Sequence, residues 1–225
     1  MTIEERGALL ARRLPFFHTL GEELRGRLAD GAGFLTLSRG DTVCGMRGRC
    51  IGLLLPVRGR ARAFIRSAEG REITLCRPGA GDVFVMPASG LFGLGAYDVT
   101  LECESYLEAL LLDPHLTAEL VAASRDGELF LLKESVRWLS LAMQATGDML
   151  LKSLEARLCS FLLGEVDRHG GDTVYLTQEE IARHIGSARE AVSRTLKALA
   201  TRGLLVVLHG GVRLLDAVGL RTLAG

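Results

Sequence analysis

The clearest chemistry in this sequence belongs to four polar side chains spaced to share the first turns of one helix: Arg189, Glu190, Ser193 and Arg194. An arginine fork can donate to O6 and N7 of guanine together, and a glutamate can accept from the amino group of cytosine. An α-helix fits the major groove of DNA, where these base edges are exposed. The pattern therefore predicts that the four side chains contact base edges.

The segment around these residues is basic, although the whole chain is neutral with 27 Lys+Arg and 27 Asp+Glu. Between Tyr175 and Arg213 there are six basic and three acidic residues. Basic side chains and free N–H groups at helix starts contact phosphates, which position a protein on DNA. We expect backbone contacts from five residues: Thr177, Ser187, Lys197, Arg202 and Arg213. The alternative is a solvated helix face with ion pairs between neighbouring turns.

Two capping boxes predict the helices that carry these residues. Thr177-x-x-Glu180 predicts a helix that begins at Gln178. Ser187-x-x-Glu190 predicts a second helix that opens near Ser187. Gly186 lies between them and permits the left-handed turn that ends the first helix. The spacing is that of a helix-turn-helix.

A glycine-rich turn follows the second predicted helix. The apolar runs Leu204–Leu208 and Val212–Leu215 flank it and predict a β-hairpin. A hairpin in this place makes the helix-turn-helix a winged one.

A separate pattern predicts a long helix over Gly127–Leu150. Apolar side chains recur there at alternating steps of three and four residues, interrupted at Thr146: Leu129, Leu132, Val136, Leu139, Met143 and Leu150. Such a stripe is typical of a helix that packs against a partner helix. An amphipathic helix that packs on its own domain shows a similar stripe, so spacing alone leaves both interpretations open.

The first part of the chain has short apolar runs separated by turn residues, which indicates a β-sandwich or barrel. Leu54–Ile65 and Arg71–Cys76 flank a turn and predict a hairpin. Alternation along the first strand predicts that Arg58, Arg60 and Arg62 share one face. That face would be either solvated or a cradle for an organic anion.

Composition sets the broad class of the protein. The 225 residues are 48% hydrophobic, which is enough for one large or two small folded domains. No apolar run approaches the roughly 18 residues that span a bilayer, and the N-terminus lacks the basic start of a secretory signal. The five cysteines contain no C-x-x-C pair, which argues against a structural zinc site and a disulfide framework. We therefore expect a cytoplasmic protein without a membrane partner.

Motifs of catalysis are absent from the sequence. There is no phosphate-binding Walker loop and no G-x-S-x-G. Between Phe34 and Leu112 there is no histidine, so the metal site of cupin enzymes cannot form in a barrel of that segment. We expect no catalytic residues, no metal site and no enzymatic activity.

From Phe17 to Leu220 the sequence resembles the CRP/FNR family of bacterial transcription regulators. The most specific stretch runs from Leu176 to Lys197 and continues through Gly203-Leu-Leu and Gly211–Asp216. The resemblance implies an α+β fold with a β-roll sensor, a cupin-like jelly roll, in residues 1–126. It also implies a dimerisation helix at 127–150 and a winged helix-turn-helix DNA-binding domain at 151–225.

The resemblance implies the same function as the pattern of polar residues, namely binding in the major groove of DNA. Family members bind a palindromic promoter site as homodimers, and the residues matching the four named at the outset touch base edges. A surface of the regulator commonly recruits RNA polymerase.

The cyclic AMP site of that family is missing from this sequence. Val85 and Met86 stand about where a Gly-Glu pair would hold the ribose, and Ala96 and Tyr97 replace an arginine pair. A buried phosphate without a guanidinium partner is costly. The resemblance therefore implies control by an effector other than cyclic AMP.

The sequence leaves that effector open among haem, an iron–sulfur cluster, a thiol switch and a small molecule. Cys44 and Cys50 do not have the tight spacing of the family's iron–sulfur cysteines. A free cysteine is most often a small core residue. The candidate sensing residues are Cys44, Cys50, Cys76, Cys103, His18 and His115.

Overall fold

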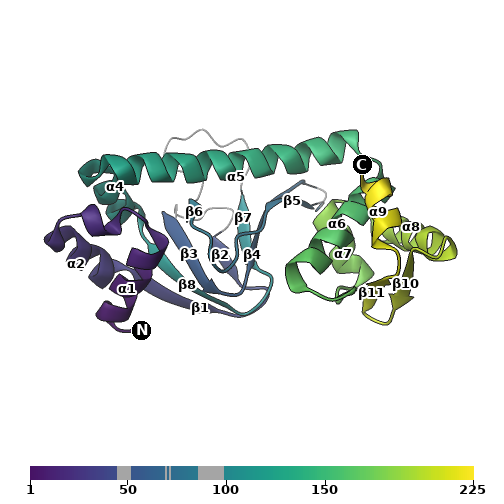
Figure 1. The fold of residues 1–225 in the computed structure, drawn as a ribbon, viewed down its shortest axis with the longest axis horizontal. Helices are drawn as coiled ribbons and strands as arrows, with labels where there is room; N and C mark the ends of the chain where they lie inside the picture. The colour runs from purple at the N-terminus through teal and green to yellow at the C-terminus, as the bar shows by residue number, and fades with distance from the viewer. Residues whose placement is uncertain (45–51, 69, 71, 86–98) are drawn as a thin grey trace. The chain divides into compact units, whose positions relative to one another are not determined.

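A computed structural model describes residues 1–44, 52–68, 70, 72–85 and 99–225 (Figure 1). The chain forms two compact units. The first comprises Met1–Ile65 and Leu75–Ala142, and the second comprises Arg66–Thr74 and Met143–Gly225. None of the helices in these described ranges is both long and apolar enough to cross a membrane. Met86, Ala96, Tyr97 and Cys50, which entered the effector argument, lie outside the described residues.

The described strands between Gly33 and Leu112 form two four-stranded sheets, each paired in antiparallel fashion where registers are defined. One sheet has the strand order β1 (Gly33–Leu37), β8 (Leu107–Leu112), β3 (Leu53–Arg58), β6 (Phe84–Val85). The other has the order β2 (Thr42–Cys44), β7 (Thr100–Cys103), β4 (Ala61–Arg66), β5 (Glu72–Cys76). Together with the helices they confirm the predicted α+β class.

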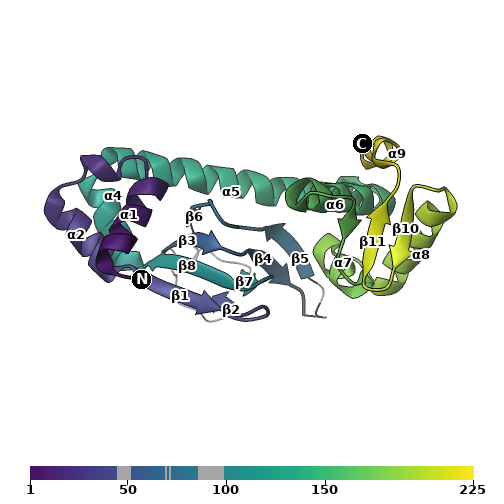
Figure 2. The same cartoon turned by 60° about the horizontal axis from the view of Figure 1, so that its bottom comes forward.

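Helices gather at one end of these sheets (Figures 1 and 2). They are α1 (Ile3–Arg13), the short 3-10 turn η1 (Phe17–Thr19), α2 (Glu22–Gly31) and α4 (Pro114–Ala123). On β3, Leu53 and Leu55 pack into the core that these helices cover, whereas Leu54 packs toward the second sheet. Because both faces of β3 are buried, its apolar residues form a continuous run instead of alternating.

One predicted strand is two strands in the structure. The prediction of a single strand over Leu54–Ile65 is wrong, because the chain turns at Gly59, where φ is +83°. A Cβ at this position would collide with the carbonyl of Tyr106. The segments before and after Gly59, β3 and β4, belong to different sheets. The hairpin with the later strand is kept, since β4 and β5 are neighbours.

This turn also separates the three arginines that were expected to share one face. Arg58 is exposed on β3, with its guanidinium 5.8 Å from the centre of the Tyr106 ring. Arg62 on β4 is only 2% exposed, and its guanidinium lies 4.1 Å from the centre of the Phe64 ring. The prediction of a common arginine face is therefore wrong.

The long helix α5 (Arg125–Leu151) begins two residues before and ends one residue after the predicted span. Trp138 on this helix is buried, and its indole Nε1 donates to the carbonyl of Val83 at 2.8 Å. Its ring meets the Phe84 ring edge-on at 4.9 Å. The adjacent Arg137 pairs with Asp82 at 3.0 Å. These contacts fasten α5 to the segment that leads into β6.

The second unit consists of α6 (Leu154–His169), β9 (Thr173–Val174), α7 (Gln178–Ile185), α8 (Arg189–Thr201), β10 (Leu205–Leu208), β11 (Gly211–Leu214) and α9 (Ala217–Ala224). Its three strands form a sheet of order β10, β11, β9. One apolar core joins these helices and the sheet, with Leu158, Ile181, Val192 and Leu196 fully buried at its centre.

Replacing Trp138 by Phe keeps an aromatic ring but takes the indole donor away from the Val83 carbonyl. We expect the free energy of unfolding to fall by about 1 to 3 kcal/mol, the usual cost of removing one partner of a buried hydrogen bond. Urea denaturation measures the change. Tyr175→Phe, at a side chain that is 83% exposed, is the control and should shift stability by less than about 0.5 kcal/mol. Equal stability of both variants would show that the bond contributes nothing.

Candidate nucleic-acid interface

Helix α7 begins at the capping box that the sequence predicts. The Thr177 hydroxyl accepts from the N–H of Glu180 at 3.2 Å, and the Glu180 carboxylate accepts from the N–H of Thr177 at 2.7 Å. Ile181, Ala182 and Ile185 are buried. The prediction of this helix and its first residue is confirmed.

The second predicted capping box is wrong. Gly186 has φ +63°, and this left-handed turn brings the N–H of Ser187 onto the carbonyl of Ala182 at 2.9 Å. Ser187 therefore closes α7 instead of opening α8. The N-cap of α8 is Ala188, which has no side-chain oxygen, and the helix begins at Arg189.

Helix α8 divides its residues cleanly between core and solvent. Val192, Leu196 and Leu199 are buried. Arg189, Glu190, Arg194 and Lys197 are exposed, and Ser193 is half-buried. The structure thus brings the four predicted base-contacting residues together on the exposed part of the first turns of α8.

The predicted wing is confirmed and has a third strand that sequence reasoning missed. β10 pairs with β11 in antiparallel register from Leu205 opposite Leu214 to Leu208 opposite Gly211. β9, a strand of two residues, adds to β11 through Val174 opposite Val212. A two-residue strand has too few positions to show alternation, so the sequence pattern could not predict it. A Cβ at Gly211 would lie 2.8 Å from the Val174 carbonyl, so this contact requires glycine.

A cleft of about 500 Å³ lies where α7, α8 and the wing turn meet. Its lining includes Thr177, Gln178, Arg189, Leu208, His209 and Gly211. The N-terminus of α7 opens into it, and the exposed N–H groups and dipole of a helix start favour an anion. Sequence reasoning missed Gln178 and His209; their places, directly after a cap and at the head of a glycine turn, were the available signal.

Ion pairs sort the basic side chains of the second unit into two sets. Several are held by carboxylates: Lys152 by Asp148, Arg168 by Glu165, Arg202 by Glu155, Arg213 by Asp172 and Arg221 by Asp167. Four others form no ion pair or hydrogen bond of their side chains with any residue that the structure describes: Arg183, Arg189, Arg194 and Lys197. All four lie on α7 or α8, so basic side chains without such a partner gather on the helix-turn-helix.

Two of the expected phosphate contacts are among the paired residues. Arg202 follows the last residue of α8, so it lies about 20 Å along the helix axis from Arg189 at 1.5 Å per residue. Arg213 on β11 pairs with Asp172 at 2.9 Å. Lys197 forms no ion pair with the residues that the structure describes. Thr177 is the N-cap of α7, and Ser187 closes the other end of that helix.

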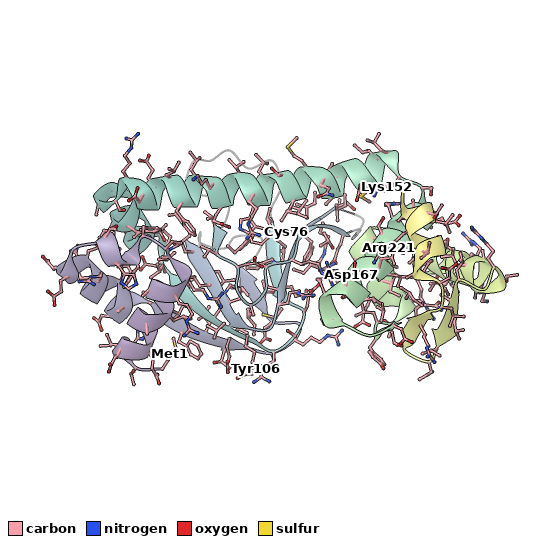
Figure 3. All side chains as sticks on the ribbon, in the orientation of Figure 1. Met1, Cys76, Tyr106, Lys152, Asp167 and Arg221 are labelled. Carbon is pink, nitrogen blue, oxygen red and sulfur yellow. The ribbon has the colours of Figure 1, made fainter. Side chains whose placement is uncertain are left out.

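Of the candidate sensing residues in the first unit, Cys76 on β5 and Cys103 on β7 both pack in the core between the two sheets. Cys103 is buried, and burial raises its pKa to about 11. Cys76, labelled in Figure 3, is half-buried, and burial together with the nearby Asp82 raises its pKa to about 12. Since the thiolate is the reactive form, both thiols have the properties of core residues. His18 and His115 are exposed, and the side chain of Cys44 lies outside the description.

No group of three or more His, Cys, Asp or Glu side chains within the described ranges is placed to hold a metal ion.

Known proteins resemble this chain both in its C-terminal part and along its whole length. The family model of the Crp-like helix-turn-helix domain matches residues 156–223. The nitrogen fixation regulation protein FixK of Bradyrhizobium diazoefficiens is 35% identical over 91 residues, which are 36% of this chain and 38% of FixK. A crystal structure of a transcriptional regulator assigned to the CRP/FNR family, from Eubacterium rectale, superposes with a TM-score of 0.87 at 28% identity and covers 95% of this chain and 99% of that one. The chain is a transcription regulator of the CRP/FNR family.

A further relative matches this CRP/FNR regulator along most of its length. The probable transcriptional regulator flp of Lacticaseibacillus casei is 26% identical over 206 residues, 91% of this chain and 93% of flp. The resemblance drawn from the sequence is confirmed, and so is the assignment of the C-terminal part as a DNA-binding helix-turn-helix.

The two capping motifs give a matched pair of stability tests. Thr177→Ala removes the side-chain cap of α7, so we expect the free energy of unfolding to fall by about 1 kcal/mol. Ser187→Ala removes a hydroxyl that caps neither helix and should change stability by less than about 0.5 kcal/mol. Urea denaturation of both variants compares them directly. A loss at Ser187 as large as at Thr177 would contradict the assignment of Ala188 as the N-cap.

Proposed function

We propose that this regulator binds a palindromic promoter site as a homodimer and reads base edges through Arg189, Glu190, Ser193 and Arg194. The observation that carries the proposal is the charge sorting on the helix-turn-helix. Arg189 and Arg194 are exposed and free of ion pairs, so binding a guanine edge breaks no interaction within the protein. Glu190 and Ser193 add acceptors next to them, which suits a mixed sequence of bases.

The cleft beside α8 supplies the contacts that set the position on DNA. We assign a backbone phosphate to it, bound by the N-terminus of α7 at Thr177 and Gln178, with His209 also in the lining. Lys197 on α8 and Ser187 at the end of α7 add further backbone contacts. We assign no phosphate to Arg202, because Glu155 holds it near the far end of α8. Phosphate contacts of this kind fix register without reading sequence.

The dimer is supported by the apolar stripe along α5. Its six aliphatic members, Leu129 to Leu150, are between 48% and 78% exposed in a single chain. Leu131 and Trp138, on the other side of the helix, are 6% and 7% exposed. The spacing of three and four residues suits the same helix of a second copy, whose stripe is identical. In this arrangement α5 is the dimerisation helix between a sensor at 1–126 and a DNA-binding domain at 151–225.

Two-fold symmetry then sets the form of the DNA site. Each recognition helix enters one major groove, so the two half-sites lie about 34 Å, or one helical turn, apart. An effector other than cyclic AMP controls binding, because Val85 and Met86 stand where cyclic AMP-binding members have a Gly-Glu pair. Recruitment of RNA polymerase completes the proposed role. The CRP/FNR family is one of transcription regulators, which are normally not enzymes.

Arg194→Ala tests base reading. We expect the affinity for the preferred duplex to fall by about 1 to 3 kcal/mol and the preference at one base pair to flatten. Selection from a randomised duplex library finds the preferred site, and titration at fixed salt measures affinity. Arg221→Ala, which removes a paired arginine on α9, is the control and should leave the preference intact. An unchanged base preference in Arg194→Ala would refute the assignment.

Met143→Lys tests the dimer. Met143 is 67% exposed on the stripe, and a charge there would be buried in the helix pair. We expect the variant to sediment as a monomer at concentrations where the unchanged chain is dimeric. Gln144→Lys adds the same charge at the exposed neighbouring position off the stripe and should remain dimeric. A dimeric Met143→Lys in analytical ultracentrifugation would show that α5 pairs through another face.

A further inference from the structure

The ion pair between Arg213 and Asp172 stands beside the cleft in which we place a DNA phosphate. Gly211 and Leu208, opposite each other in the wing, both line that cleft. Side chains two positions apart on a strand share a face, so Arg213 lies on the same face of β11 as Gly211, about 7 Å further along. Arg213 is exposed and two residues from the cleft-lining Gly211, yet its Nε donates to the Asp172 carboxylate at 2.9 Å.

The Asp172 carboxylate is held in place by more than the arginine. Its Oδ1 accepts from the Thr173 hydroxyl at 2.7 Å, and Thr173 lies opposite Arg213 in the sheet. The hydrogen bonds from Thr173 and from Arg213 lower the pKa of this carboxyl, so it is ionised at neutral pH. An ionised carboxylate at a fixed position beside the arginine acts as an internal substitute for a phosphate.

Stability does not explain the pair. Both side chains are about half exposed, at 56% for Arg213 and 52% for Asp172, and ion pairs this exposed add little to folding. The connection of this segment to β11 is made by the backbone, where the N–H of Leu214 donates to the carbonyl of Asp172 at 2.8 Å. The carboxylate is therefore dispensable for holding the strands together.

We infer that Asp172 restrains DNA binding by competing with a backbone phosphate for Arg213. This inference rests on the proposed function and adds a residue that sets its strength. With Asp172 in place, the charge of Arg213 is cancelled within the wing, in contrast to the free charges of Arg189 and Arg194. Removing the carboxylate charge frees one more cation for the phosphate backbone.

Asp172→Asn tests the inference, because the amide keeps an oxygen for Thr173 and loses the negative charge. The probe is a mixed-sequence duplex of about 30 base pairs, which spans two half-sites. Each added phosphate contact steepens the plot of log affinity against log salt by about 0.9. We expect the variant to bind more tightly, with an advantage that grows about 3.5-fold as salt falls from about 200 to 50 mM.

Two controls separate this effect from a general change of charge. Asp167→Asn makes the same charge change in the exposed pair of Asp167 with Arg221, which joins α6 to α9 (Figure 3), and should leave the salt slope unchanged. Arg213→Ala removes the arginine, and adding Asp172→Asn to it should then bring no further gain. Thermal denaturation checks that each variant is folded.

The outcomes are distinct. Equal or weaker binding by Asp172→Asn, while the unchanged chain binds the duplex, overturns the competition and leaves the proposed function standing. An equal gain from Asp167→Asn also overturns it, since the effect would then be one of net charge. Failure of the unchanged chain and of every variant to bind any duplex is failure of the proposed function, and this inference fails with it.

Discussion

Helix α5 has two apolar faces, and the rest of the molecule is arranged around the need to cover both. Leu131 closes the core beneath the N-terminal helices, and Trp138 closes the core between the two sheets. The opposite face carries aliphatic side chains that a single chain leaves in water. Burial of apolar surface is worth about 25 cal/mol per Å², which supports the proposed pairing of this face with a second helix. One helix thus joins the sensor core to the proposed dimer interface.

The distribution of charge in this protein is set by which side chains form ion pairs, since the chain has no excess of basic residues. The chain has no net charge. In the second unit, most carboxylates form ion pairs with arginines or a lysine away from the exposed side of α8. Four basic side chains on α7 and α8 form no ion pair with the residues that the structure describes: Arg183, Arg189, Arg194 and Lys197. In the proposed complex, DNA would meet unpaired guanidinium groups on α8, whereas the charge of Arg213 in the wing is paired with Asp172. A neutral regulator can in this way bind a polyanion locally without attracting it over its whole surface.

The sensor half has the interior of a stable fold. Two of its cysteines are core residues whose pKa burial raises, and Arg77 and Glu104 form a nearly buried pair at 2.8 Å. Such thiols are protonated at neutral pH, which favours their packing role over a thiol switch. Trp138 and Arg137 of α5 contact Val83 and Asp82, which lie directly before β6.

The sequence by itself determined the features that depend on neighbours a few residues away. The capping box at Thr177, the left-handed turn at Gly186, the wing hairpin and the stripe on α5 all follow from spacing within one element. Only the tertiary structure decided which candidates are available. Gly59 sends β3 and β4 into different sheets, and Asp172 and Glu155 pair with Arg213 and Arg202. These outcomes depend on contacts between segments up to 47 residues apart, and such contacts have no local signature.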